Sequence, residues 1–119
     1  RTGMITVHLY RPFSARYFLR VMPKSVKSIA VLDRTKEPGA LGEPLYMDVR
    51  NIFADDPKAP IIVGGRYGLS SKDTTPAQIM SVFENLGRKE IKNNFTIGIK
   101  SALLRDLKLD RTRNFMDNL

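Results

Sequence analysis

Two short apolar runs, Ser28-Ile29-Ala30-Val31-Leu32-Asp33 and Pro60-Ile61-Ile62-Val63-Gly64, decide the fold class of this chain. Each is a nearly continuous run of aliphatic residues, which is typical of a β-strand covered on both faces. We therefore expect both runs in the middle of a sheet. Two further β-rich runs, Met4–Tyr10 and Phe95–Ile99, bring the number of predicted strands to four.

Three helical patterns lie between these runs, and each has a recognisable start. Ser14 is a typical N-cap, and Thr75 precedes a stripe of apolar residues at helical spacing. Pro44 suits a first helical turn, because that turn does not use the N–H that proline lacks. The predicted helices cover Ala15–Val21, Pro44–Phe53 and Pro76–Leu86.

The predicted order of elements is βαβαβαβ, which favours a parallel sheet with helices on both faces. We therefore expect an α/β fold: a three-layer α/β/α sandwich with a mostly parallel sheet of four or five strands. This domain should cover residues 1–100. Residues 101–119 should form a helical tail of uncertain origin, with one or two helices around Leu103, Leu107 and Phe115.

The composition excludes several kinds of chemistry. The chain has 119 residues and 42% hydrophobic residues, enough for one modest core, and no apolar stretch long enough to span a membrane. It has no cysteine and one histidine, so thiolate catalysis, iron–sulfur ligation and an ordinary zinc site are excluded. The net charge of +8 favours anionic partners, or reflects a domain taken from its neighbours.

Three loops follow the predicted strands, at the sheet edge where α/β folds bind ligands. Three readings of them stay open. Basic side chains next to glycines and a helix N-terminus are suited to binding an anion. However, the spacing of the glycines fits neither a P-loop nor a dinucleotide-binding fingerprint. The alternatives are tight turns or contacts with a neighbouring domain. The candidate residues are Arg11; Arg34, Lys36, Glu37 and Gly39; and Gly64, Gly65, Arg66 and Tyr67.

No catalytic arrangement can be assembled from the remaining residues. His8 lies within a predicted strand, where a structural or solvent-facing histidine is more common than a catalytic one. The acidic residues are scattered, so neither a triad nor a carboxylate pair is indicated. Aromatic residues are not interleaved with the basic ones, which makes nucleic-acid binding a weak alternative.

Several uncommon motifs occur in a fixed order, and together they resemble the pyruvate:ferredoxin/flavodoxin oxidoreductases. The resemblance extends from about residue 3 to residue 99. The motifs are Leu9–Phe13, Ile29–Gly39, Gly42–Tyr46, Gly64–Lys72, Thr75–Ala77, Val82–Leu86 and Asn94–Ile99.

The resemblance implies the second domain of such an enzyme, which is similar to the C-terminal domain of transketolase. The parent enzymes decarboxylate pyruvate on thiamine diphosphate with Mg²⁺, pass electrons through iron–sulfur clusters to ferredoxin or flavodoxin, and form acetyl-CoA from coenzyme A. The resemblance implies that these cofactors lie mainly on other domains. This chain is then expected to be architectural, with no catalytic residue, no metal and no activity alone. Its expected partners are the other domains of a homodimeric, cytoplasmic enzyme, with no nucleic acid and no membrane.

The resemblance ends after Ile99, where the family usually has an acidic pair followed by Val-Thr and this chain has Lys100-Ser101-Ala102.

Two alternatives to the architectural reading remain. The chain could be a stand-alone phosphate- or nucleotide-binding module that uses the basic loops. It could also be the same domain within a different multidomain redox flavoprotein.

Overall fold

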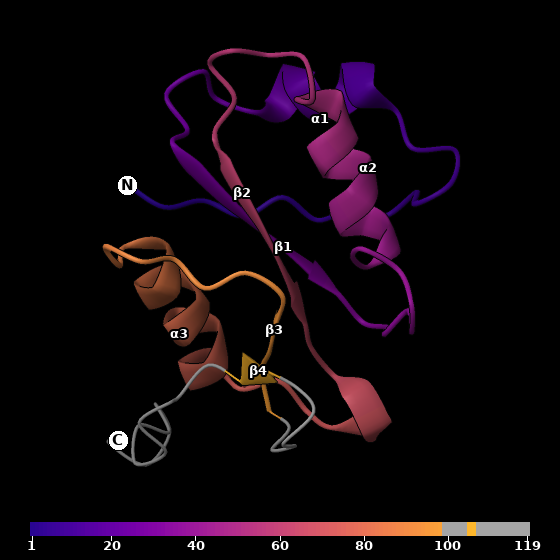
Figure 1. Cartoon of the computed structure of the whole chain (residues 1–119), viewed down its shortest axis with the longest axis vertical. Coiled ribbons are helices and arrows are strands. Elements are labelled where there is room, and N and C mark those ends of the chain that lie inside the picture. Colours follow the sequence, from indigo (N-terminus) through magenta and orange to yellow (C-terminus); the bar gives the residue numbers. More distant parts are fainter. Residues whose placement is uncertain (99–104, 107–119) are drawn as a thin grey trace.

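In the computed structural model, which describes residues 1–98 and 105–106, helices and short parallel strands alternate (Figure 1). No helix among these residues has both the length and the apolarity to cross a bilayer. The helices are α1 (Ala15–Val21), α2 (Pro44–Ile52) and α3 (Pro76–Leu86), with a 3₁₀ turn, η1, at Leu69–Ser71. The strands are β1 (Ser28–Asp33), β2 (Ile61–Arg66), β3 (Phe95–Thr96) and β4 (Arg105–Asp106).

The four strands form one parallel sheet in the order β1-β2-β3-β4. The register aligns the last residues of the strands: Asp33 pairs with Arg66, and Arg66 with Thr96. The carboxyl ends of β1, β2 and β3 therefore meet in one row at one edge of the sheet.

Helices cover both faces of the sheet, because side chains alternate along each strand. Ile29 and Val31 of β1 pack with Tyr46 and Val49 of α2 and with Phe18 of α1. The alternate side chains, including those of Ala30, Leu32 and Val63, pack with Val82 of α3 and with Phe95 and Ile97. Figure 1 shows α2 and α3 on opposite sides of the sheet. The predicted three-layer α/β/α class is confirmed.

The predicted helix starts are also confirmed. The Ser14 hydroxyl accepts a hydrogen bond from the Tyr17 amide, and Pro44 occupies the first turn of α2. Thr75 and Gln78 form a reciprocal capping box at the start of α3, and Gly87 ends that helix.

The first predicted strand, Met4–Tyr10, is wrong, because the structure has no strand there. An alternation of apolar and polar residues does not by itself make a strand, since the backbone N–H and C=O groups must also pair with a neighbouring strand. Within the described residues no strand pairs with this segment, and most of its side chains are exposed, Met4 to 84% and Leu9 to 68%. The predicted order βαβαβαβ therefore loses its first strand, and His8 lies outside the sheet.

The other strands differ from the prediction in their limits and positions. β2 continues two residues beyond Gly64, through Gly65 to Arg66, so these candidates lie in the sheet and not in a loop. The strand predicted over Phe95–Ile99 is shorter, and β1 lies at an edge of the sheet instead of the middle. Residues 105–106 of the predicted helical tail form β4, and the rest of that tail lies outside the described residues.

The two glycines in β2 are required by close packing on both faces of the sheet. A Cβ on Gly64 would lie 2.8 Å from the ring of Tyr46, and one on Gly65 would overlap the ring of Phe95. The Phe95 side chain is fully buried, so it has little room to move. These glycines thus let aromatic rings of the same domain approach the backbone.

We predict that Gly65→Ala lowers the free energy of unfolding by about 1–3 kcal/mol, because the added methyl group overpacks the core at Phe95. Urea unfolding followed by circular dichroism measures the change. Gly3→Ala is the matched control, since a Cβ at Gly3 has no heavy atom within 4 Å. An unchanged unfolding midpoint in Gly65→Ala would contradict this account of the packing.

Candidate functional site at the carboxyl ends of the strands

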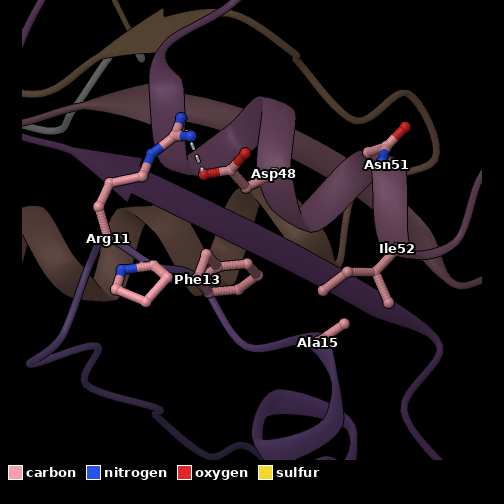
Figure 2. A pocket seen from close by; sticks show the side chains of 7 residues that line it. Arg11, Phe13, Ala15, Asp48, Asn51 and Ile52 are labelled. Atoms are coloured by element: carbon pink, nitrogen blue, oxygen red, sulfur yellow. Dashed lines mark ion pairs between the residues drawn. The ribbon is translucent and has the colours of Figure 1, made fainter.

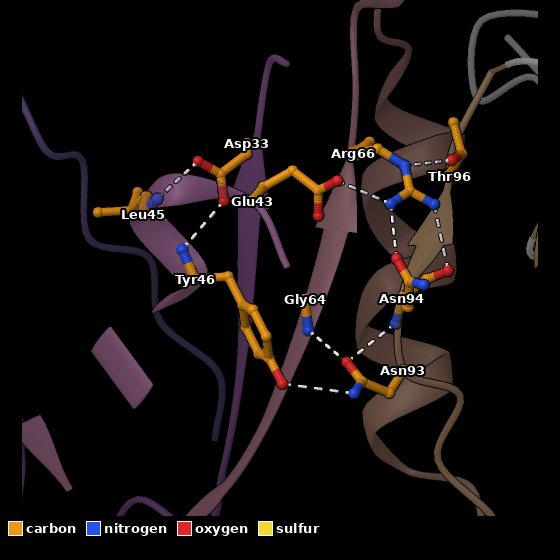
Figure 3. Close-up of polar contacts among 9 residues, drawn as sticks. All are labelled: Asp33, Glu43, Leu45, Tyr46, Gly64, Arg66, Asn93, Asn94 and Thr96. Carbon is orange, nitrogen blue, oxygen red and sulfur yellow. Dashed lines mark hydrogen bonds and ion pairs between the residues drawn. The ribbon is translucent and has the colours of Figure 1, made fainter. Parts of the chain in front are cut away.

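A row of buried polar side chains crosses the sheet at the carboxyl ends of its strands (Figure 3). Asp33, Arg66 and Thr96 are neighbours in register and are exposed to only 7%, 4% and 0%. Buried polar groups require partners, so the contacts of these side chains determine what else they can bind.

Most N–H groups of the Arg66 guanidinium are bound by partners from its own domain. Its Nε donates to Thr96 Oγ1 at 2.9 Å, and its Nη1 donates to Glu43 Oε1 at 2.9 Å. Asn94 accepts two more hydrogen bonds, from Nη1 to its side-chain oxygen at 2.6 Å and from Nη2 to its carbonyl at 3.3 Å. Four donor contacts are thus made out of the five N–H groups of an arginine. Arg66 is an internal cross-link of the fold, not an exposed donor for a ligand.

Asp33 occupies the N-terminus of α2. Its two carboxylate oxygens accept hydrogen bonds from the Leu45 amide at 2.9 Å and the Tyr46 amide at 3.0 Å. Glu43 stands at the N-cap position of α2, but its side chain makes no capping bond and pairs with Arg66 instead. Asp33 therefore supplies the negative charge that a helix N-terminus attracts.

Burial raises the pKa of Asp33 above its ordinary value of 3.8. The two amide hydrogen bonds act in the opposite direction, and the carboxylates of Glu43 and Asp48 raise the pKa further. The site at the start of α2 is thus filled by a carboxylate from the same chain. This occupation weighs against an external anion there, which is one of the readings that the sequence leaves open.

A second polar group joins the strands below this row. The Asn93 side-chain oxygen accepts from the Gly64 amide at 2.8 Å and from the Asn94 amide at 2.9 Å. The Tyr46 hydroxyl accepts from Arg50 at 2.9 Å and from Asn93 at 3.4 Å. Sequence reasoning missed Asn93 and Asn94. The usable signal was the pair Asn-Asn immediately before a β-rich run.

The loops after β1 and β2 lie together, as expected. Arg34 Nε donates to the carbonyl of Gly68 at 3.3 Å, and the Tyr67 amide donates to the carbonyl of Asp33 at 3.1 Å. Lys36, Glu37 and Gly39 are exposed on the first of these loops. Of the predicted candidates, these residues and Arg34 remain at the surface, while Gly64, Gly65 and Arg66 are buried and Tyr67 is half-buried.

Arg11 lies apart from this row, beside an open groove of about 630 Å³ between the Arg11–Ala15 segment and α2 (Figure 2). Its guanidinium lies 3.3 Å from Asp48, donates to the Tyr10 hydroxyl and stacks over the Tyr10 ring. Phe13 and Ile52 supply apolar walls. Asp48 already neutralises the cation, so the groove is a weak site for an anion.

No group of three or more histidine, aspartate, glutamate or cysteine side chains able to hold a metal ion occurs in residues 1–98. The carboxylates closest to the row, Asp33 and Glu43, are bound to amides and to Arg66. Both carboxylates are thus already engaged within the domain. What the polar row does is hold three strands and a helix in one arrangement.

We predict that Arg66→Met destabilises the chain by about 3–5 kcal/mol, because it leaves the buried carboxylate of Glu43 without its partner. The double variant Arg66→Met/Glu43→Gln should recover part of that loss, since the uncompensated charge is gone. Chemical denaturation of the single and double variants measures the coupling. Arg11→Met is the matched control: the Arg11 side chain is 63% exposed against 5% for Arg66, so water screens its ion pair more and its loss should cost less. Equal losses in Arg66→Met and Arg11→Met would refute the internal cross-link.

The raised pKa of Asp33 predicts a specific pH dependence of stability. Between the unfolded value of 3.8 and the higher folded value, the folded state binds more protons than the unfolded state. This group therefore makes the free energy of unfolding decrease as pH rises through that window. Asp33→Asn should remove this slope, and should cost about 1–3 kcal/mol because an amide offers only one acceptor to two N–H groups.

Thermal unfolding of wild type and Asp33→Asn, measured across the window just above pH 3.8, tests this dependence. Asp55→Asn removes a carboxylate from an exposed position and should keep the wild-type slope. An Asp33→Asn chain with the wild-type slope would show that another group titrates there.

Comparison with known proteins identifies relatives for nearly the whole chain, although no protein-family model matches it. The chain is 58% identical to the pyruvate:ferredoxin oxidoreductase of Moorella thermoacetica over 99 residues, and 54% identical to the pyruvate-flavodoxin oxidoreductase of Enterobacter agglomerans over 99 residues. Each match covers 83% of this chain and 8% of the relative.

A probable pyruvate-flavodoxin oxidoreductase of Escherichia coli is 49% identical over 124 aligned residues, covering 99% of this chain and 10% of the relative. That match extends into residues 101–119, beyond the point where the motifs end. The chain thus spans about a tenth or less of the length of these three relatives. Since all three carry names of one enzyme class, this chain belongs to the pyruvate:ferredoxin/flavodoxin oxidoreductases, of which it matches one small segment.

Proposed function

We propose that the chain is an architectural domain of an enzyme that oxidatively decarboxylates pyruvate to acetyl-CoA and CO₂ and passes the electrons to ferredoxin or flavodoxin. The observation that carries the proposal is the identity of 54–58% to such oxidoreductases over 83% of the chain. Because the chain spans only 8% of their length, the reaction belongs to the complete polypeptide.

The hydrogen bonds within the polar row support an architectural role. The side chains of Arg66, Asp33 and Asn93 form hydrogen bonds with the strands and with α2. They therefore hold the fold together and are not free to bind substrate.

The cofactors of this proposal lie on other domains. We assign thiamine diphosphate with Mg²⁺ to other domains because the buried carboxylates of Asp33 and Glu43 are already bound within this one, and the chain has no cysteine for iron–sulfur ligation. Coenzyme A enters as a substrate of the complete enzyme. We further propose a transketolase-like arrangement of this domain, a homodimeric enzyme and a cytoplasmic location.

The exposed loop residues Arg34, Lys36, Glu37 and Gly39 then face a neighbouring domain. Their position supports this, because the Arg34 contact with Gly68 fixes one loop against the other at a single sheet edge. Asp33 already fills the adjacent helix N-terminus, which disfavours the alternative of a phosphate- or nucleotide-binding module.

We predict that the complete enzyme reduces flavodoxin or ferredoxin in a pyruvate- and coenzyme A-dependent reaction, whereas the 119-residue chain has no turnover. Titration calorimetry of the chain with thiamine diphosphate, coenzyme A and ATP should give no saturable heat. The same titrations on the complete enzyme are the control and should give saturable binding of thiamine diphosphate.

Two results would contradict the proposal. A complete enzyme without pyruvate-dependent reduction of either carrier would remove the assigned reaction. Saturable binding of ATP to the chain, abolished by Lys36→Ala, would instead favour the nucleotide-binding module.

A further inference from the structure

β1 has the composition of an interior strand, yet it lies at the edge of the described sheet. Its first five residues, Ser28–Leu32, contain neither a charged residue nor a proline. Natural edge strands are usually protected by such residues, by bulges or by covering segments. The side chains of β1 also contribute to both apolar layers, Ile29 and Val31 to one and Ala30 and Leu32 to the other.

The backbone of β1 presents an open row of hydrogen-bonding groups. The carbonyls of Lys27 and Asp33 accept from Ile61 and Tyr67, so the odd-numbered residues of β1 direct their N–H and C=O groups toward β2. The groups of Ala30 and Leu32 point to the opposite side. No described residue forms a hydrogen bond with them there. Both residues are half-buried, where unpaired backbone groups are costly.

We propose that the free edge of β1 is completed by an apolar β-strand from the same polypeptide, outside these 119 residues. The inference rests on the proposed function, in which the chain is one domain of a larger enzyme. It identifies the edge of β1 as the surface that contacts the rest of that enzyme. An open strand edge requires an extended partner, because only a strand matches its regular spacing of N–H and C=O groups. The partner must be apolar on both faces, since both helical layers reach β1.

The length of the relatives favours this source. The chain spans 8% of the Moorella and Enterobacter proteins, so most of such a polypeptide lies outside it. The chain's own Met4–Tyr10 segment fits the edge poorly, because its alternate residues include Thr6 and His8 and would bring them into an apolar layer. In the structure this segment is not paired with β1.

A second copy of the chain is the other candidate occupant. Antiparallel pairing through the outer edge must set outward-directed residues opposite each other, so Ala30 would face Ala30 and Lys27 would face Asp33 of the other copy. Charge does not exclude that pairing; the length of the relatives favours a segment of the same polypeptide, and the crosslinking experiment below distinguishes the two.

Amide hydrogen exchange in the complete enzyme tests the proposal residue by residue. Ile29 and Val31 are the internal controls, because their amides point toward β2. We expect Ala30 and Leu32 to be as protected as these controls, with exchange slowed on the order of 100-fold or more. Rapid exchange at Ala30 and Leu32 beside protected Ile29 and Val31 would overturn the inference, and so would rapid exchange along the whole strand.

A photo-crosslinking amino acid in place of Ser28, followed by mass spectrometry, identifies the occupant in the same enzyme. A crosslink to a segment of the same polypeptide outside these residues supports the proposal. A crosslink to residues 4–10, to a second copy or to no peptide overturns it. The same substitution at exposed Lys58 is the control for unspecific labelling. Pyruvate-dependent carrier reduction, measured in the same preparation, separates failure of this inference from failure of the proposed function.

Discussion

The buried guanidinium of Arg66 is the interaction on which the described fold depends. It is the last residue of β2, and its hydrogen bonds reach β3 through Thr96 and the start of α2 through Glu43. Taking a guanidinium and a carboxylate out of water costs free energy that only well-aligned hydrogen bonds offset. The alignment of Arg66 therefore restricts where β3 and α2 can lie. A buried pair of this kind adds less to stability than to the choice of one arrangement over others.

Asp33 extends this constraint to β1. Its carboxylate binds two amides of α2, so β1 and β2 are each tied to the same helix start, one through Asp33 and the other through Glu43. Asn93 and Asn94 tie the residues that lead into β3 to the same region. The ends of β1, β2 and β3 thus have their positions fixed by polar contacts as well as by the apolar layers.

The sequence predicts the features that depend on residues within one helical turn. It does not predict the features that depend on which segments pair with each other in the fold. Helix starts at Ser14, Pro44 and Thr75 follow from capping rules that act within one turn, so they were predictable. Met4–Tyr10 has the alternation of a strand, but a strand exists only with a neighbour, which periodicity cannot supply. Arg66 was expected in a loop because glycines preceded it. Those glycines instead make room for Tyr46 and Phe95, a contact between residues remote in sequence.

The same distinction explains why β1 reads as an interior strand. Its apolar run follows from its own residues, whereas its place at the edge follows from which neighbouring strands occur among the described residues. Selection acts on the whole polypeptide, so the composition of a strand reflects its surroundings there. Ala30 and Leu32 are half-buried with unpaired backbone groups, a combination that is costly in water-excluded surroundings and suited to a paired one. The chain spans only 8% of the length of its relatives. In such a chain we expect strands whose composition suits neighbours that lie outside it.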